Sequence, residues 1–299
     1  MSAYFRRKML PGALAPAPAS VAGGLLVAEG LKSDESKVST RLGVQYDIAP
    51  DLMVYASYSR GFKGAALNLL NFLTAAQVAS GGYLVPPEIP TAYEAGLRAA
   101  FLDRRLQVNA TVFNETFKGF QATAYDALTQ SNTLTSAGEL RSRGFELEAL
   151  AAPARGLTLS ANLAYTDATF TDFANAPCYA GQMLISGGGC HAQGATFVQN
   201  LKGARLNNAP EWAYTLSTSY TRPLGWHDLN GFVDVNYAYR SKVNFGLNQD
   251  PNTVQNGFGV ASLNLGVQAP DQGLRLALFA RNLFDEHYAS FIYPSSFQS

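Results

Sequence analysis

The sequence predicts an all-β fold, an antiparallel transmembrane β-barrel, here a partial barrel of about ten strands with long extracellular loops and short periplasmic turns. Three observations predict it: apolar residues at every second position, connections that alternate between short and long, and a low content of charge. Charged residues make up 15% of the chain, whereas soluble domains contain about 25%. No apolar run reaches the roughly 18 residues of a transmembrane helix, and membrane strands, which alternate apolar and polar residues, do not form such runs.

Residues 1–37 are expected to form an irregular N-terminal segment or loop, and residues 38–299 the partial barrel. The chain begins with a basic RRK stretch followed by an Ala-rich stretch, as a secretory signal peptide would. Prolines at positions 11, 16 and 18 interrupt the Ala-rich stretch, so a loop is the favoured interpretation. A segment this short cannot build a separate globular domain.

The predicted strands rest on an alternation with a period of two residues. In residues 106–112, LQVNATV, and in residues 157–163, LTLSANL, aliphatic residues alternate with amides and hydroxyls. A helix would scatter these aliphatic residues around its surface, whereas a pleated strand collects them on one face. The ten predicted strands are residues 38–48, 52–62, 93–102, 105–120, 138–151, 156–171, 211–222, 230–242, 257–269 and 274–287.

Residues 143–172 are predicted to form a long hairpin that turns at residues 153–156. The residues of this hairpin expected to face lipid are Leu157, Leu159, Ala161 and Leu163. Glu146 and Glu148 alternate with apolar residues and are expected to face the lumen. Their predicted ion-pair partners across the barrel wall are Arg98, Arg275 and Arg281.

The connections between the predicted strands alternate strictly in length. The short ones are 49–51, 102–104, 153–156, 223–228 and 270–273, and the long ones are 63–92, 121–137, 172–210 and 243–256. An outer-membrane barrel sorts its connections in this way, with short periplasmic turns and longer extracellular loops. The alternative is a soluble β-sandwich, but it has no reason to sort its loops and would leave several aliphatic rows in water.

Aromatic residues near the ends of the predicted strands agree with a membrane barrel. They are Trp212, Tyr214, Trp226, Tyr288 and Phe291. An amphipathic ring at this position sits at the level of the lipid headgroups.

Five segments in order resemble the barrel of TonB-dependent outer-membrane receptors. They are YASYSRGFK at 55–63, TAYEAGLRAAFLDRRLQVNATVFNETFKGFQ at 91–121, RGFELE at 143–148, NAPEW at 208–212 and RNLFDEHY at 281–288. Each string is weak by itself, but the five occur in the family's order, each in the matching strand or loop. The resemblance covers about residues 38–288.

The resemblance implies a barrel of about 22 strands around an N-terminal plug, located in the outer membrane of a Gram-negative bacterium. It implies energised uptake of a scarce ligand, a ferric siderophore being favoured, with outer-membrane lipid as one partner. The other implied partner is the TonB-ExbB-ExbD machinery, which acts through a plug domain that we expect to be missing from this chain. The alternatives are a passive pore or structural barrel, and a non-functional gene fragment. A half-barrel completed by another copy is also open, although a fragment is favoured.

Cys178 and Cys190 are the only cysteines and lie in the longest predicted loop. In an oxidising compartment they are expected to form a disulfide. His191 follows Cys190, but two cysteines and one histidine without a fourth ligand at a recognisable spacing do not make a zinc site. His227 and His287, in a turn and at a strand end, are expected to be solvated or interfacial.

Ligand contacts in this family come from the loops and the upper lumen. The residues predicted to contact an anionic iron chelate are Arg60, Lys63, Asn68, Tyr83, Tyr125, Arg141 and Arg143. The alternative for each is a solvated loop residue or a salt bridge of the lumen. No catalytic constellation, cofactor motif or metal site is expected. Equal numbers of basic and acidic residues, 22 each, give no reason to expect a nucleic-acid partner.

Overall fold

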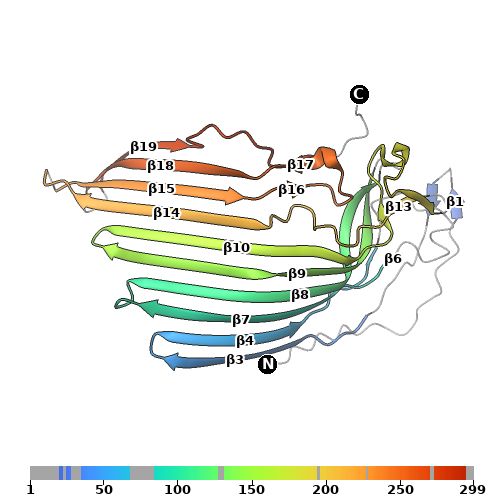
Figure 1. Ribbon diagram of the computed structural model, residues 1–299, viewed down its shortest axis with the longest axis horizontal. Coiled ribbons are helices and arrows are strands. Elements are labelled where there is room, and N and C mark those ends of the chain that lie inside the picture. Colours follow the sequence, from blue (N-terminus) through green and yellow to red (C-terminus); the bar gives the residue numbers. More distant parts are fainter. Residues whose placement is uncertain are drawn as a thin grey trace.

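Ten long strands form a single antiparallel sheet in which each strand pairs with the next long strand of the sequence (Figure 1). The computed structural model describes residues 20–22, 25–27, 35–67, 84–126, 131–193, 196–226, 228–269 and 273–293. The long strands are β3 (Thr40–Ala49), β4 (Leu52–Arg60), β7 (Ile89–Phe101), β8 (Leu106–Asp126), β9 (Ser131–Ala154), β10 (Leu157–Asp172), β14 (Trp212–Pro223), β15 (Asn230–Arg240), β18 (Phe258–Gln268) and β19 (Arg275–Arg281). The predicted all-β, antiparallel, ten-stranded architecture is confirmed.

The largest differences from the predicted strand boundaries are at the tips of β8 and β9 and at the end of β19; in addition, β7 begins at Ile89, four residues before the predicted start at 93. Residues 121–137, predicted as a long loop, continue β8 and β9 as a paired hairpin whose register runs on to Asp126 and Ser131. The ladder keeps one register on both sides of Gly119, from the pair Lys118 and Glu139 to the pair Phe120 and Ala137, although Gly119 itself has a φ of +68°. The last strand ends at Arg281, six residues before the predicted end at 287.

Short elements gather at one end of the sheet, which we call the loop end, while tight connections occupy the opposite turn end (Figure 1). The short elements are β1 (Ser20–Ala22), β2 (Leu25–Val27), β5 (Ala66–Leu67), β6 (Leu84–Val85), β11 (Ala176–Pro177), η1 (Gln182–Leu184), β12 (His191–Gln193), β13 (Thr196–Gln199), β16 (Val243–Asn244), η2 (Pro251–Thr253) and β17 (Val254–Gln255). The predicted separation of long loops from short turns is therefore present in the fold.

The register gives the sheet an aliphatic face and a polar face. Leu163 pairs with Leu147 and Tyr214, whereas its neighbour Asn162 pairs with Glu148 and with a threonine. Paired residues share a face and consecutive residues alternate. Large apolar side chains stay exposed on the aliphatic face, including Leu278 at 73%. A continuous apolar surface of this kind is suited to lipid and not to water.

The buried core lies at the loop end, on the polar side of the sheet. Leu140 and Phe170 pair with one another and share the polar face with Glu146. Phe173 and Leu201 from the connection between β10 and β14, and Leu247 from the connection between β15 and β18, pack over them. The core therefore fixes these connections as a roof over the loop end of the polar face.

Gly156 closes the turn between β9 and β10 with a positive φ of 77°. A Cβ at this position would lie 2.1 Å from the carbonyl oxygen of Thr221, so no other residue fits without moving the neighbouring strand. None of the helices in the described part of the chain is both long and apolar enough to span a bilayer.

Candidate functional site

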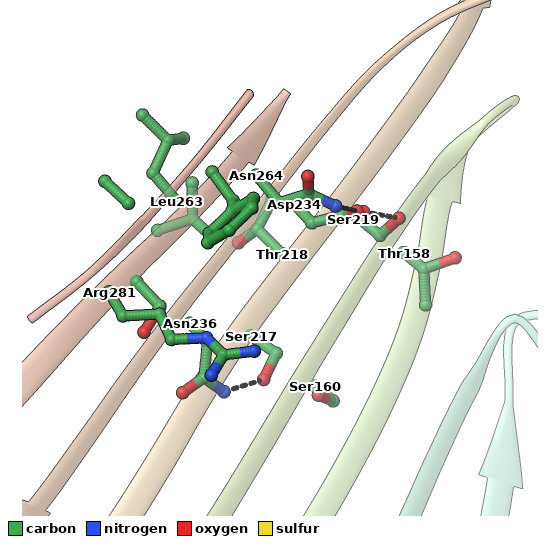
Figure 2. Close-up of a pocket in the computed structure, with 14 residues that line it drawn as sticks. Thr158, Ser160, Ser217, Thr218, Ser219, Asp234, Asn236, Leu263, Asn264 and Arg281 are labelled. Carbon is green, nitrogen blue, oxygen red and sulfur yellow. Dashed lines mark hydrogen bonds between the residues drawn. The ribbon is translucent and has the colours of Figure 1, made fainter. Parts of the chain in front are cut away.

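The polar face of β10, β14, β15 and β18 carries a ladder of hydroxyl and amide side chains (Figure 2). Ser219 Oγ donates to Asp234 Oδ1 at 2.7 Å, and Asn264 Nδ2 donates to the second carboxylate oxygen at 3.1 Å. Asn236 Nδ2 donates to Ser217 Oγ at 2.8 Å. These residues line a groove of about 600 Å³ near the turn end of the sheet. The groove offers many neutral hydrogen-bonding groups, the carboxylate of Asp234 and the guanidinium of Arg281.

The polar face of β3 to β9 is more strongly charged. The Arg98 guanidinium lies 5.9 Å from the centre of the Tyr55 ring, and the Tyr55 hydroxyl lies 3.0 Å from Thr111 Oγ1. The Tyr55 ring covers Gly96, where a Cβ would approach it to 2.6 Å. The glycine therefore lets the ring lie flat against the wall and hold the arginine beside it.

The predicted ion pairs of Glu146 and Glu148 are wrong. Asn109 stands between Arg98 and Glu148 in one register row, and its Nδ2 donates to Glu148 Oε2 at 3.1 Å. Arg275 instead lies 3.8 Å from an Asp234 oxygen. Among the described residues, no ion pair joins either glutamate to an arginine. The carboxylates of this part of the wall therefore face the polar side without a basic partner.

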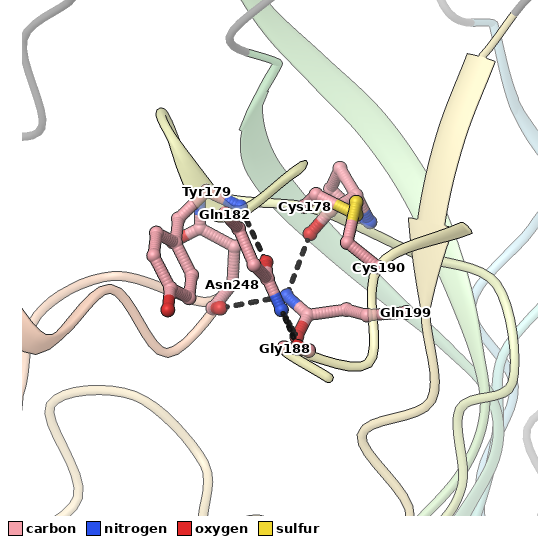
Figure 3. The surroundings of a disulfide bond; sticks show 8 residues. Cys178, Tyr179, Gln182, Gly188, Cys190, Gln199 and Asn248 are labelled. Atoms are coloured by element: carbon pink, nitrogen blue, oxygen red, sulfur yellow. Dashed lines mark hydrogen bonds between the residues drawn. A yellow bond between two sulfur atoms is a disulfide. The ribbon is translucent and has the colours of Figure 1, made fainter. Parts of the chain in front are cut away.

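Cys178 and Cys190 are joined by a disulfide in the roof of the loop end (Figure 3). Beside it, the buried Gln199 side chain accepts a bond from Gln182 Nε2 at 2.8 Å. Gln199 Nε2 donates to the carbonyl oxygens of Pro177 at 3.0 Å and of Asn248 at 2.8 Å. One glutamine therefore ties the disulfide-bearing connection to the connection between β15 and β18.

Hydrogen bonds among its own polar side chains fix the conformation of the connection between β15 and β18. Asp250 Oδ1 accepts from the backbone N–H of Asn252 at 2.9 Å, at the start of η2. Thr253 Oγ1 donates to Asn244 Oδ1 at 2.6 Å. Asn248 is 2% exposed, and its amide nitrogen and oxygen make no hydrogen bond in the described structure. Apart from that amide, the roof is a well-satisfied polar network.

Lys63, predicted to contact ligand, belongs to an anchoring network at the loop end. Its Nζ lies 3.7 Å from Glu88 Oε2, and the same oxygen accepts from the backbone N–H of Gln121 at 2.8 Å. The Gln121 amide donates to the carbonyl oxygens of Gly64 and Pro86. The network fastens the two ends of the connection between β4 and β7 to β8. The Lys63 side chain is 56% exposed, so it neutralises Glu88 and still faces solvent.

Arg60, Arg141 and Arg143 lie on the aliphatic face of the sheet, not on its polar face. The pairings through β7 and β8 place Arg60 and Arg141 in one register row. Arg143 lies on the face opposite to Glu146 and on the same face as Phe145. Its Nε lies 3.1 Å from Asp167 Oδ2. These three side chains therefore point away from the upper lumen. Their role in ligand binding stays a prediction, and their position on the aliphatic face speaks against it.

The remaining predicted site residues are less informative. Asn68, Tyr83 and His227 lie outside the described residues, and Tyr125 belongs to the far end of β8. His287 is exposed, with Nδ1 3.9 Å from an Asp285 oxygen. In the part of the chain that the structure describes, no three His, Cys, Asp or Glu side chains come together as metal ligands.

Four residues organise the loop end although the sequence does not mark them: Glu88, Gln121, Gln182 and Gln199. Each is buried, and each bonds to residues far away in the chain. In the sequence each is only a long polar residue inside a predicted loop. Solvated loop residues look the same, so the sequence does not distinguish the two. The same holds for Arg205, whereas Asp167 lies inside a predicted strand, where nothing in the sequence marks its two arginine partners.

The chain matches the family described as "TonB dependent receptor-like, beta-barrel" over residues 18–283. It is 28% identical over 150 residues to the ferrichrome outer membrane transporter/phage receptor of Escherichia coli K12, covering 47% of this chain and 17% of that protein. It is 26% identical over 209 residues to the metal-pseudopaline receptor of Pseudomonas aeruginosa, covering 66% of this chain and 23% of that protein.

A similar fold occurs in the crystal structure of the ferric yersiniabactin uptake receptor of Yersinia pestis. The TM-score is 0.65 at 19% identity, and the match covers 91% of this chain and 36% of that one. The chain thus spans about a fifth of the curated relatives and about a third of this receptor. Proteins of this family are transport receptors of the Gram-negative outer membrane and not enzymes. The chain belongs to the TonB-dependent receptor family, and its ten long strands are strands of that family's outer-membrane β-barrel.

Proposed function

We propose that the protein containing this chain takes up a ferric siderophore or a similar metal chelate across the outer membrane, and that the polar face of the sheet lines its path. Two sequence relatives are named for ferrichrome and for a metal–pseudopaline complex. Both names describe metal bound by a small polar chelator, and energised uptake would couple this barrel to the TonB-ExbB-ExbD machinery through a plug domain.

The division of the sheet into two faces under a roof of folded loops carries this proposal. The aliphatic face suits lipid, so the polar face forms the lumen. The ladder of Ser217, Ser219 and Asn236 gives a chelate or a plug exchangeable hydrogen bonds. The opposite charges of Asp234 and Arg281 in the same groove leave its lining without a net charge. At the loop end, Lys63 offers an exposed cation to an anionic chelate.

We keep Lys63, Asn68, Tyr83 and Tyr125 as proposed ligand contacts at the mouth. Lys63 borders the connection between β4 and β7, to which Asn68 and Tyr83 belong in the sequence. Tyr125 is next to the last residue of β8, at the loop end.

Uptake of radiolabelled iron by cells producing the whole receptor tests the function. Cells limited for iron should accumulate iron from a subset of chelates, and an uncoupler should abolish the accumulation, because TonB-dependent uptake uses the proton-motive force. Accumulation that does not saturate and survives the uncoupler would point to a passive pore instead.

A pair of neighbouring substitutions tests the lining of the path. Ser217→Trp puts a large ring into the lumen groove and should reduce uptake several-fold at unchanged receptor abundance. Leu216→Trp puts the same ring on the lipid face, where 49% of Leu216 is exposed, and should leave uptake unchanged. Equal uptake by the two variants would contradict the assigned path.

A further inference from the structure

Three arginines gather on the lipid face at the loop end, two of them around the carboxylate of Asp167. Arg143 Nε lies 3.1 Å from Asp167 Oδ2, and Arg205 Nη1 lies 4.0 Å from Asp167 Oδ1. Arg205 also lies 3.5 Å from Glu211 Oε1 and donates to the carbonyl oxygen of Thr166. We call Arg141, Arg143 and Arg205 the arginine cluster.

The register brings these three side chains onto one patch. Thr169 pairs with Arg141 on one side and bridges Arg205 on the other, so the two arginines flank it in a single row. Neighbouring strands are about 5 Å apart and residues two apart on a strand about 7 Å. The three Cα atoms therefore lie within about 12 Å of one another.

The cluster sits directly beyond a belt of aromatic rings. Phe145 stacks on Tyr165 with ring centres 5.7 Å apart, and Tyr165 lies 4.8 Å from Trp212. The aliphatic row of β10 from Leu157 to Tyr165 spans roughly 27 Å along the strand, or roughly 21 Å across the membrane at a tilt of about 40°. That length nearly fills an apolar band of about 25 Å. The arginines thus stand at the level of the headgroups of the extracellular leaflet.

The charges of the cluster are only partly balanced within the chain. Two of the three guanidinium groups, those of Arg143 and Arg205, face the carboxylates of Asp167 and Glu211. Arg141 forms no ion pair with any described residue, and its buried Nε has no hydrogen-bond partner. The Arg143 side chain is 55% exposed and that of Arg205 37%. The Asp167 carboxylate orients the guanidinium groups of Arg143 and Arg205. A guanidinium group can bind a phosphate with two parallel hydrogen bonds.

We propose that the arginine cluster binds the phosphate of an anionic lipid headgroup in the extracellular leaflet. The guanidinium groups contact the phosphate, while the acyl chains lie along the aliphatic face below Phe145 and Tyr165. The ferric ligand is excluded as the occupant because these side chains leave the sheet on the side opposite the lumen. The site therefore anchors the receptor at a fixed depth and orientation, whatever ligand the lumen carries.

Lipid binding to the purified whole receptor tests this site. The probes are the diphosphoryl and monophosphoryl forms of lipid A, a phosphorylated glycolipid, with binding measured by native mass spectrometry in mild detergent. The wild-type receptor should retain the diphosphoryl form more strongly. Arg141→Gln should weaken its binding about five-fold, the factor equivalent to about 1 kcal/mol for one arginine near a charged membrane surface. Arg141→Lys keeps the charge and should retain most of the binding.

Two further variants separate a lipid site from a structural cluster. Asp167→Asn removes the internal anion and should strengthen binding of the diphosphoryl lipid, whereas a purely structural role predicts a loss of stability and no gain in binding. Arg98→Gln deletes the same charge from the lumen face and serves as the matched control.

Three results would overturn the proposal. The first is equal binding by Arg141→Gln and the wild type, and the second is an equal loss in Arg98→Gln. The third is displacement of the lipid by inorganic phosphate at concentrations similar to those of the lipid, which would show a site for a free anion.

Discussion

Replacing Gln199 by leucine should release the roof of the loop end without unfolding the barrel wall. The glutamine side chain makes three hydrogen bonds, and their loss leaves the buried carbonyls of Pro177 and Asn248 without partners. At about 1–3 kcal/mol for each unsatisfied buried group, the local opening free energy should fall by about 3 kcal/mol. Amide hydrogens of residues 173–210 and 243–256 should then exchange on the order of 100-fold faster.

The assay is hydrogen exchange with mass spectrometry on the receptor embedded in lipid, with peptides of β10 and β14 as internal references. Asn200→Leu is the matched control, because Asn200 is an exposed neighbouring amide whose only described bond, to the N–H of Lys202, water can replace. Equal acceleration in the two variants, or none in Gln199→Leu, would refute the assignment of Gln199 as the tie between the two connections.

Three other perturbations test the faces and the loop anchors. Leu163→Arg puts a charge on the lipid face and should lower the stability of the barrel in the membrane by about 2–4 kcal/mol. An immunoblot of outer membranes should then show less receptor, whereas Asn162→Arg on the lumen face should leave the amount of receptor unchanged. Replacing Cys178 and Cys190 together by serine should remove about 3 kcal/mol of constraint on the unfolded loop and speed cleavage of that loop by added protease. Glu88→Ala should expose the connection between β4 and β7 to protease and leave the strands intact, because it breaks the anchor to Gln121.

The wall of the fold could be predicted from the sequence because the alternation of aliphatic and polar residues is local. LTLSANL in β10 has only one arrangement that puts its leucines on one face, and the register of β9 and β14 follows from it. The hairpin at the tips of β8 and β9 could not be predicted in the same way. Its residues are mostly small and polar, so no row of aliphatic residues marks the pairing, which runs on past Gly119 in an unchanged register.

The site was predicted less well for two physical reasons. Arg141 and Arg143 were placed by their distance from the loop, although the alternation that sends Glu146 to the lumen already sends both of them outward. The sequence therefore held that information. It did not hold the contacts of Glu88 and Gln199, because their partners lie in other connections and come within reach only after the sheet has formed.

The paired hairpin of β8 and β9 forms part of the surface that the receptor presents to molecules outside the cell. From the aromatic belt at Phe145 to its tip at Ser131, it extends roughly 46 Å along the strand, with hydrogen-bonded register partners along almost all of that length. Flexible loops of the same length would collapse into the sugar layer of the surface, whereas a paired ribbon keeps its height. Ala124 and Ala137 of this ribbon are buried in the same core as Phe173 and Leu201 of the roof. Ribbon and roof thus form one folded surface, and antibodies raised against intact cells should recognise its folded shape and not peptides of the unfolded loops.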